Sequence, residues 1–344
     1  MRILFYSIKD FEHPYLLEAN KKNFPVKMTE SALGTETASF AEGFTVVSIF
    51  TGDDASAPVI KKLKEVNVKY IAIRAAGYDN VDLQAAKENA IQVANVPAYS
   101  PYSIAEHALA LLFAMNRKLI LANDQVHHRN FKMNNLIGYD LHGKTIGIIG
   151  TGNIGGTLLK ILNGFNCKLL AYDIRRNDDL VTNYNANYVS LEQLCRESDI
   201  ISIHTPLNEQ TKYLINKNLI SIMKKGVMLI NTGRGACVNT TDVLHYLESG
   251  HIGYFGADVY EKERGLFFHD WTGKALNDDL LKRLLMLPNV LITPHQAFAT
   301  KEALGNIAET TFYNIECWAA GRCSDNELYK PAINYSSLAA TNNL

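Results

Sequence analysis

The stretch Lys144-Thr-Ile-Gly-Ile-Ile-Gly150-Thr-Gly152-Asn-Ile-Gly155 decides the fold of this chain. It places the pattern G-x-G-x-x-G directly after an apolar run, and a helical pattern follows it. Gly150 permits a tight turn, Gly152 lets the backbone approach a pyrophosphate, and Gly155 permits close helix packing. The first helical turn offers N–H groups and a positive dipole end to phosphates. The stretch therefore predicts a dinucleotide-binding strand–loop–helix unit.

A second apolar run ends in Tyr172-Asp173, 18 residues after Gly155. A carboxylate about 20 residues after the glycine loop is typical of the acid that binds the adenosine ribose hydroxyls. Asp173 favours NAD over NADP, because a carboxylate repels the 2′-phosphate of NADP. Arg175 and Arg176 weaken this preference, since a nearby arginine can accept that phosphate.

Outward from this unit, short apolar runs alternate with helical patterns along the whole chain. The runs predicted as strands are Arg2–Ser7, Thr45–Phe50, Tyr70–Arg74, Ile91–Asn95, Thr145–Ile149, Lys168–Tyr172, Ile200–His204, Val227–Asn231 and Val290–Thr293. Several are rich in Val and Ile on both faces, as buried parallel strands are. The alternation predicts an α/β fold with doubly wound parallel sheets.

Two long helical patterns divide the chain, one from about Pro101 to Ala122 and one from about Thr300 to Ala320. The βαβ series lies between them. We therefore expect a Rossmann-like dinucleotide-binding domain over residues 101–299, inserted into a second domain made of residues 1–100 and 300–344. A ligand is expected in a cleft between the two domains. The polar stretch from about Lys330 is expected to be poorly ordered.

Composition narrows the class of protein. The 344 residues carry 34 Lys and Arg against 35 Asp and Glu, so a broad basic surface for nucleic acid is not expected. No apolar run reaches the roughly 18–20 residues of a membrane span, and the N-terminal run is too short for a signal peptide. The five cysteines form no C-x-x-C pair, which favours reduced thiols over disulfides or zinc ligands. We expect a cytoplasmic protein without a metal.

Three segments supply candidates for chemistry. Arg234 follows an apolar strand between two glycines, where its planar fork suits a substrate carboxylate; a structural salt bridge or a phosphate contact is the alternative. If Arg234 served the cofactor, Arg74 would be the next candidate. His295 follows another strand and is a candidate proton donor. On their own, Asp258, Glu261 and Glu263 are typical of a solvated loop.

Several motifs together resemble the D-isomer-specific 2-hydroxyacid dehydrogenases over nearly all of residues 1–328. They are Arg74-Ala-Ala-Gly77-Tyr-Asp-Asn-Val-Asp82, Asn95-Val-Pro-Ala-Tyr99-Ser-Pro101, Ala105-Glu-His107, the glycine loop, His204-Thr-Pro206, Asn231-Thr-Gly-Arg234-Gly, Asp258-Val-Tyr-Glu261 and His295-Gln-Ala-Phe298. Gly265-Leu-Phe-Phe268 and Asn277-Asp-Asp279 resemble the subgroup of fermentative D-lactate dehydrogenases. Two departures, Gly233 for the commoner serine and Pro294 for glycine, remove no group that the reaction needs.

The resemblance implies a role for each candidate. Arg234 would bind the substrate carboxylate and polarise the keto oxygen, while His295 would be the acid/base with Glu263 as its partner. The substrate positions it implies in addition are the backbone N–H groups of Ala76 and Gly77 and the side chains of Tyr99, Phe298 and Phe50. The cofactor positions are Gly150, Gly152, Asn153, Ile154, Gly155, Asp173, Thr205, Pro206, Thr211, Thr232, Gly233 and Asp258, the last near the nicotinamide amide. The domain of residues 1–100 and 300–344 would bind substrate.

The expected activity is NADH-dependent reduction of pyruvate to D-lactate. Reduction of larger 2-keto acids is the alternative within the family, and a non-enzymatic NAD-sensing corepressor is a remote one. The apolar faces of the helix from Pro101 to Ala122 indicate a closed homo-oligomer, most simply a homodimer. His107 in that helix is expected to serve packing or an interface, and His204 to be structural.

Overall fold

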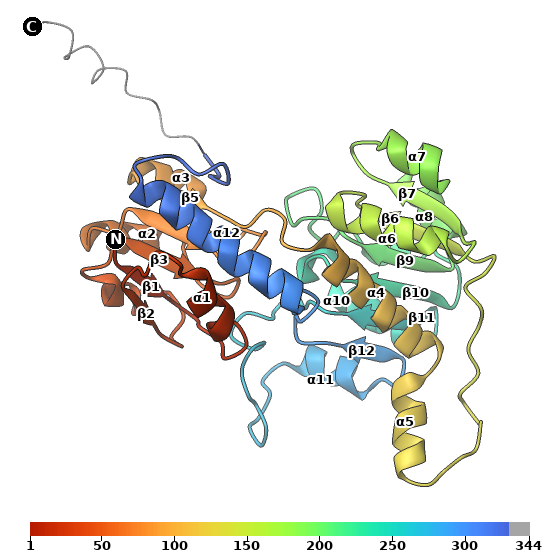
Figure 1. Cartoon of the computed structure of the whole chain (residues 1–344). Coiled ribbons are helices and arrows are strands. Elements are labelled where there is room, and N and C mark those ends of the chain that lie inside the picture. Colours follow the sequence, from red (N-terminus) through yellow and green to blue (C-terminus); the bar gives the residue numbers. More distant parts are fainter. Residues whose placement is uncertain (330–344) are drawn as a thin grey trace, which may run out of the picture. The chain divides into compact units, whose positions relative to one another are not determined.

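The computed structural model describes residues 1–329, which form an α/β protein with two parallel sheets (Figure 1). The predicted polar tail from about Lys330 lies outside the described residues. The chain divides into two compact units, one formed by Met1–Tyr99 together with the stretch from Lys301, the other by Ser100–Thr300. No helix among the described residues is long and apolar enough to cross a membrane.

The unit that contains the N-terminus has a five-stranded sheet within the described residues, in the order β2-β1-β3-β4-β5. Its elements are β1 (Ile3–Phe5), α1 (His13–Ala19), β2 (Val26–Met28), η1 (Ala38–Ala41), β3 (Val46–Ile49), α2 (Ala57–Glu65), β4 (Tyr70–Ile73), α3 (Leu83–Glu88), β5 (Gln92–Ala94) and α12 (Lys301–Ala319). One face packs on α1 and α12, where Phe312, Ile315 and Trp318 cover the sheet. The C-terminal helix thus completes the core of the N-terminal unit.

The second unit has a seven-stranded parallel sheet within the described residues, in the order β12-β11-β10-β9-β6-β7-β8. Its strands are β6 (Thr145–Ile149), β7 (Lys168–Tyr172), β8 (Asn187–Tyr188), β9 (Ile200–Ile203), β10 (Val227–Asn231), β11 (Ile252–Ala257) and β12 (Val290–Ile292). Its helices are α4 (Pro101–Asn116), α5 (Leu119–His127), α6 (Asn153–Asn163), α7 (Asp178–Tyr184), α8 (Leu191–Glu197), α9 (Lys217–Ile220), η2 (Gly235–Cys237), α10 (Thr240–Glu248) and α11 (Asp279–Met286).

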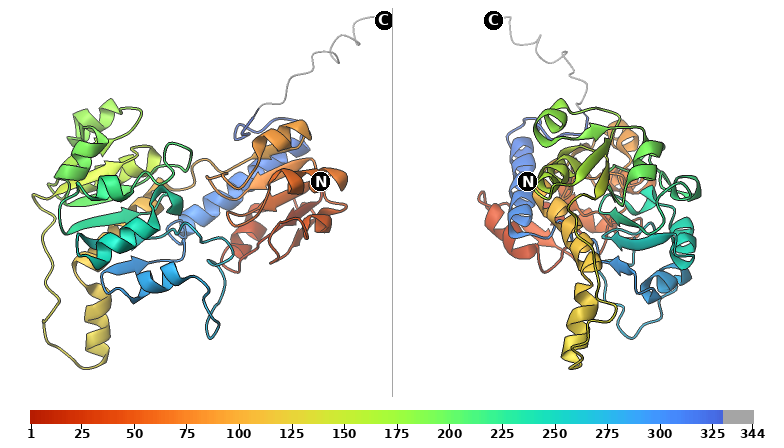
Figure 2. Two further views of the ribbon diagram at one scale, coloured as in Figure 1. Left: turned by 180° about the vertical axis from the view of Figure 1, so that it is seen from behind. Right: turned by 90° about the vertical axis from the view of Figure 1, so that its right-hand side faces the viewer.

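Helices cover both faces of this second sheet (Figure 2). Strand side chains alternate between the faces, so Met228 and Ile230 of β10 pack in one core while Val227 and Leu229 pack in the other. The first core is closed by α4 and α6, the second by α8, α10 and α11. The chain turns from β6 toward β7 on one side and β9 on the other, which makes the β6–β9 junction a topological switch point.

All nine predicted strands are present, and the structure adds β2, β8 and β11. The prediction of one helix from Pro101 to Ala122 is wrong. The helix α4 ends at Asn116, Lys118 takes a left-handed φ of 53°, and α5 starts afresh at Leu119. Ser100 caps α4 by accepting a hydrogen bond from the N–H of Ser103, and Pro101 occupies its first turn.

Candidate active site

The predicted site residues of the second unit follow one row of paired strand residues. Backbone register aligns Ile149 with Ile203, Ile203 with Asn231, Asn231 with Ala257, and Ala257 with Ile292. The strands are parallel, so their carboxyl ends meet at one edge of the sheet. Ligands of open α/β sheets bind outside this edge, at the switch point. The glycine loop, Arg234, Glu263 and His295 all come within a few residues of the row.

The glycine loop has the geometry that a dinucleotide needs. Gly150 has a φ of 88°, and a Cβ on Gly155 would lie 1.9 Å from the carbonyl oxygen of Gly150. A Cβ on Gly152 would meet nothing within 4 Å, so the fold itself does not demand glycine there. The helix α6 begins without a side-chain cap, whereas Ser100, Ser190 and Asn239 cap α4, α8 and α10. Uncapped N–H groups beside open space fit a pyrophosphate.

Asp173 follows β7 and lies beside this loop. One carboxylate oxygen accepts a hydrogen bond from the Thr151 N–H at 2.6 Å, and the other accepts from the Arg175 N–H at 2.9 Å. Arg176 pairs with Asp178 at 2.9 Å. Asp173 is therefore fixed next to the loop, as an acid that binds ribose hydroxyls would be. The predicted positions Asn153 and Ile154 are the first two residues of α6.

The turn after β9 carries two more predicted cofactor positions, Thr205 and Pro206. It packs on the glycine loop, since a Cβ on Gly150 would lie 2.8 Å from the His204 carbonyl oxygen. Burial lowers the pKa of His204 to about 4. The neutral ring lies 2.8 Å from the Ser202 hydroxyl and 3.3 Å from that of Thr232. His204 therefore has the structural surroundings expected for it.

Two further threonine positions also lie at this edge. The Thr211 hydroxyl donates to the Pro206 carbonyl at 2.6 Å and so closes the turn. Thr232 and Gly233 directly follow β10. The cofactor roles of Thr205, Pro206, Thr211, Thr232 and Gly233 stay predictions.

Arg234 stands on a short, tightly held loop. Asn231, the last residue of β10, donates from its amide to the Arg234 carbonyl at 3.0 Å and accepts from the Gly233 N–H at 3.1 Å. Gly235 lies so close to the next loop that a Cβ would be 2.1 Å from the carbonyl carbon of Tyr260. The half-buried arginine is thus brought up against the loop after β11. The Asn231 contacts were not predicted, although its position in the quoted motif could have suggested them.

His295 and Glu263 form a direct pair. The Nδ1 atom of His295 lies 2.8 Å from Oε1 of Glu263, and the other Glu263 oxygen accepts from the Tyr260 N–H at 2.8 Å. The ring centroid of His295 lies 6.0 Å from that of Phe268 and 6.4 Å from that of Phe298. The acid that read as part of a solvated loop is therefore the partner of the histidine. The imidazole of His295, a group that can give and take a proton, therefore lies beside the rings of Phe268 and Phe298.

Asp258 has a task that the sequence did not reveal. Its carboxylate is buried and accepts from the N–H groups of Gln296 at 2.9 Å and Ala297 at 2.8 Å. It also accepts from the Thr293 hydroxyl at 2.5 Å. Asp258 therefore holds the turn on which His295 stands. Its contact with the nicotinamide amide stays a prediction.

The remaining predicted residues belong to the N-terminal unit. Ala76 and Gly77 follow β4, and the Ala76 carbonyl accepts from the Asn95 side chain at 2.7 Å. The Tyr99 carbonyl accepts from the Asn306 side chain at 2.6 Å. Their substrate-binding roles, with that of Phe298, stay predictions.

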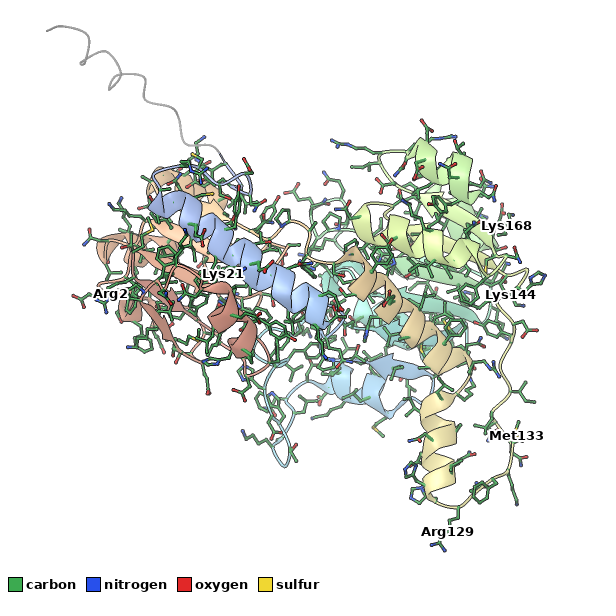
Figure 3. All side chains as sticks on the ribbon, in the orientation of Figure 1. Arg2, Lys21, Arg129, Met133, Lys144 and Lys168 are labelled. Atoms are coloured by element: carbon green, nitrogen blue, oxygen red, sulfur yellow. The ribbon has the colours of Figure 1, made fainter. Side chains whose placement is uncertain are left out.

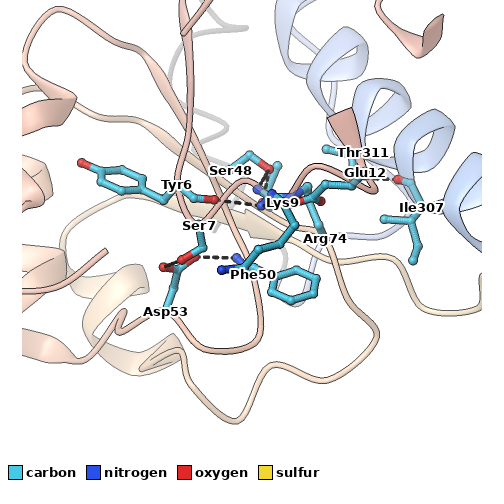
Figure 4. Close-up of polar contacts among 11 residues, drawn as sticks. Tyr6, Ser7, Lys9, Glu12, Ser48, Phe50, Asp53, Arg74, Ile307 and Thr311 are labelled. Atoms are coloured by element: carbon cyan, nitrogen blue, oxygen red, sulfur yellow. Dashed lines mark hydrogen bonds and ion pairs between the residues drawn. The ribbon is translucent and has the colours of Figure 1, made fainter. Parts of the chain in front are cut away.

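Arg74 is unsuited to be a substitute substrate anchor. Its guanidinium is buried and donates to Glu12 at 2.8 Å, to the Tyr6 carbonyl at 2.8 Å and to the Ser48 hydroxyl at 3.1 Å (Figure 4). It ties the ends of β1, β3 and β4 to the start of α1. A buried charge with these partners serves the fold, because its removal would leave Glu12 buried without a cation.

Within residues 1–329, no group of three or more His, Cys, Asp or Glu side chains could hold a metal ion. The candidate chemical groups at this edge of the sheet are Arg234, the His295–Glu263 pair and the glycine loop.

Comparisons with known proteins agree with this chemistry. Residues 109–297 match the model of the D-isomer specific 2-hydroxyacid dehydrogenase, NAD binding domain. The chain is 42% identical to the D-lactate dehydrogenase of Escherichia coli over 329 residues, 95% of this chain and 100% of the relative. The structure of the pyruvate reductase of Chlamydomonas reinhardtii is 43% identical with a TM-score of 0.88, covering 95% of this chain and 98% of that one.

A third relative was solved with ligands. The D-lactate dehydrogenase from Aquifex aeolicus, complexed with NAD and lactic acid, is 32% identical with a TM-score of 0.86, over 96% of this chain and 100% of that one. The chain belongs to the D-isomer-specific 2-hydroxyacid dehydrogenase family and is an NAD-dependent oxidoreductase. The fold class and cofactor predicted from the sequence are confirmed.

Proposed function

We propose that this enzyme reduces pyruvate to D-lactate with NADH, in a reversible reaction. The observation that carries the proposal is the His295–Glu263 pair at 2.8 Å, held at the same sheet edge as Arg234 and the glycine loop. A 2-keto acid offers a carboxylate for an arginine and a carbonyl oxygen for a proton donor. Each of these groups has a counterpart at the edge.

The residues divide the work. Bound NADH supplies the hydride that reduces C2 of the keto acid. Arg234 binds the carboxylate with its planar fork and stabilises the negative charge that develops on the carbonyl oxygen. His295 donates a proton to that oxygen from Nε2, because its Nδ1 faces Glu263. Glu263 contacts Nδ1 and so keeps the ring oriented for the transfer.

Two aromatic rings favour a small substrate. Phe268 and Phe298 lie beside the His295 ring, with centroids 6.0 and 6.4 Å away, and so occupy space next to the reacting carbonyl. A methyl group, as in pyruvate, needs little room there. Larger 2-keto acids remain the alternative substrates.

Steady-state oxidation of NADH with pyruvate, 2-oxobutyrate, 2-oxoisocaproate and phenylpyruvate tests the proposal. We expect kcat/KM to be highest for pyruvate and the product to be the D-isomer by chiral chromatography. A higher kcat/KM for 2-oxoisocaproate or phenylpyruvate would replace pyruvate by a larger substrate. NADH binding without turnover of any of the four acids would favour the sensor alternative.

We also propose a homodimer in the cytoplasm. The apolar faces of α4 do not supply the interface predicted from them, because Ala105, Ala108, Leu111 and Leu112 are buried within their own unit. The support comes instead from α5 and the loop after it, here called the α5 arm (residues 119–137). In the described chain none of the α5 residues is buried. Its exposed apolar side chains are Leu119, Ile120, Leu121, Val126, Phe131, Met133 and Ile137.

Met133 lies on the segment that returns from α5, well away from the sheet (Figure 3). Several exposed apolar side chains on one segment are typical of an interface, and a second copy of this chain supplies a matching surface by symmetry. Light scattering at micromolar concentration should give twice the mass of the chain. Replacing Ile120 and Ile137 together by Asp should give the monomer mass; a monomeric wild type would refute the dimer.

A further inference from the structure

A buried polar network lies behind the turn that carries His295. The imidazole Nε2 of His107 lies 3.0 Å from the Thr293 hydroxyl and 3.4 Å from Oδ1 of Asp258. The Thr293 hydroxyl lies 2.5 Å from the same carboxylate oxygen. The His107 side chain is 16% exposed and that of Asp258 1%. Three side chains from α4, the end of β11 and the end of β12 therefore meet out of solvent.

The network ends at the backbone directly after His295. The Asp258 carboxylate accepts hydrogen bonds from the N–H groups of Gln296 and Ala297, directly after the histidine. His295 itself has a φ of 56°, in the left-handed region that residues with a side chain rarely adopt. Such a conformation persists only where neighbouring contacts fix it. Asp258 provides these contacts.

Packing of α4 fixes the place of His107. Residues 107, 111 and 115 share one face of α4, because they are spaced by four. A Cβ on Gly256 of β11 would lie 2.5 Å from the Met115 methyl carbon and 3.4 Å from the Leu111 Cβ. The helix therefore rests directly on β11, and His107 reaches the strand ends from this face.

The direction of the hydrogen bonds follows from proton counting. An ionised Asp258 only accepts, so the single hydroxyl proton of Thr293 goes to Asp258. The Thr293 oxygen then accepts from His107, which must carry its proton on Nε2. A neutral ring with that proton and an imidazolium both satisfy this arrangement. An aliphatic side chain at position 107 would leave the Thr293 oxygen without this donor.

We propose that His107 is a positioning residue for the reaction: through Thr293 and Asp258 it fixes the turn that aims the imidazole of His295. The sequence indicated only packing or an interface for this histidine. The inference rests on the proposed function insofar as His295 is the proton donor. It predicts an effect on turnover, since misplacing a catalytic group by about 1 Å can cost about 100-fold in rate.

Three single variants and one double variant test the network. His107→Leu should lower kcat with pyruvate about 10- to 100-fold, while KM and the Kd of NADH stay within about threefold of wild type. Thr293→Val should have a similar effect. His107→Gln keeps an N–H donor of similar reach and should restore kcat to within about threefold of wild type. In the double variant His107→Leu/Thr293→Val, the fold-loss of kcat should be at most about twice that of the slower single variant. Both substitutions break the same chain of hydrogen bonds, so their effects should not multiply.

Leu112→Ala is the matched control on the same helix. Leu112 is buried in the core of the unit, so its truncation lowers Tm without touching the network. Its kcat at 25 °C should equal that of wild type. A His107→Leu enzyme with kcat within twofold of wild type would overturn the proposal, and so would a His107→Gln enzyme as slow as His107→Leu. If the wild-type enzyme does not turn over pyruvate, the proposed function is contradicted but the role of His107 is not. The variants would then be compared with the 2-keto acid that the enzyme prefers.

Discussion

The Nδ1 atom of His295 lies 2.8 Å from Oε1 of Glu263, so the imidazole and the carboxylate are joined by a hydrogen bond. Glu263 cannot turn away easily, because its other oxygen accepts from the Tyr260 N–H at 2.8 Å. The ring nitrogen that faces away from Glu263 is Nε2. This geometry assigns the two nitrogens different tasks, one for orientation and one for proton transfer.

Replacement of His295 by Gln should lower kcat for pyruvate reduction about 10²–10⁴-fold, the usual cost of losing a general acid. The Kd of NADH should change little, since His295 lies beyond β12 and the cofactor loop follows β6. Fluorescence titration with NADH and single-turnover kinetics measure the two quantities. His142→Gln, which alters an exposed histidine before β6, is the control. Near-normal turnover in the His295→Gln enzyme would remove His295 from the chemistry.

Replacement of Glu263 by Gln should lower kcat for pyruvate reduction by up to about 100-fold, because the carboxylate orients the His295 ring through Nδ1 and a misplaced catalytic group can cost about that much in rate. The Kd of NADH should stay close to that of wild type. Steady-state kinetics and an NADH titration measure the two quantities. Glu261→Gln, which changes an acid on the same loop whose charge raises the pKa of Tyr213, is the control and should keep the wild-type kcat. An unchanged kcat in the Glu263→Gln enzyme would argue against the pairing.

Periodicity and the glycine motif predicted the fold because most strands here are uninterrupted apolar runs. The strand β11 was missed for a physical reason. Its sequence Ile252-Gly-Tyr-Phe-Gly-Ala is broken by glycines that look like turn residues. In the structure they permit close packing: a Cβ on Gly253 would lie 2.5 Å from the Gly226 carbonyl oxygen, and one on Gly256 would meet Met115.

The site was predicted in its residue types but not in its support. A pattern can place Arg234 and His295 after strand ends, whereas contacts between distant segments need the register of the sheet. Asp258 holds the turn of His295 through bonds to backbone N–H groups far along the chain, which leave no local sequence pattern. Asn231 holds the Arg234 loop through contacts within the same motif, so its place in the sequence could have suggested them. The break between α4 and α5 was missed because Lys118 in a left-handed conformation is not a typical helix stop.

Asp173→Ala should weaken NADH binding and narrow the gap to NADPH. The variant loses the acceptor for the ribose hydroxyls and the charge that repels a 2′-phosphate. It also loses the hydrogen bonds from the Thr151 and Arg175 N–H groups, and this loss would weaken the binding of NADH and NADPH to the same extent. The ratio of the two Kd values therefore reports on the ribose contact. Asp179→Ala, an exposed acid of α7, should leave this ratio unchanged; a wild type that already prefers NADPH would refute the role of Asp173.

His204 should make stability depend on pH. Burial lowers its pKa from 6.5 to about 4, so the unfolded chain binds a proton in this range that the folded chain does not. Stability is therefore lost as the pH falls from about 6.5 to about 4. Urea unfolding gives the free energy of unfolding at pH 7.5 and at pH 5.0. Between these two pH values it should fall by about 1–2 kcal/mol less in His204→Gln than in wild type. The free energy of unfolding of His142→Gln should fall by as much as that of wild type. An equal fall in wild type, His204→Gln and His142→Gln would contradict a neutral His204.

Arg234→Lys should raise KM for pyruvate and lower kcat, while NADH affinity changes little. Lysine keeps the charge but lacks the planar fork that reaches both the carboxylate and the carbonyl oxygen. The contact to that oxygen strengthens as negative charge develops, so its loss falls on kcat as well as on KM.

Steady-state kinetics with a separate NADH titration measure these effects. Arg283→Lys, in a surface pair with Glu248 at 2.6 Å, is the control and should behave as wild type. An Arg234→Lys enzyme that loses NADH binding but keeps its KM for pyruvate would show that Arg234 serves the cofactor. Arg74 could not then replace it as the anchor, because Glu12, Ser48 and the Tyr6 carbonyl already occupy its guanidinium. The family resemblance implies the backbone N–H groups of Ala76 and Gly77, after β4, as the next candidates for binding the carboxylate.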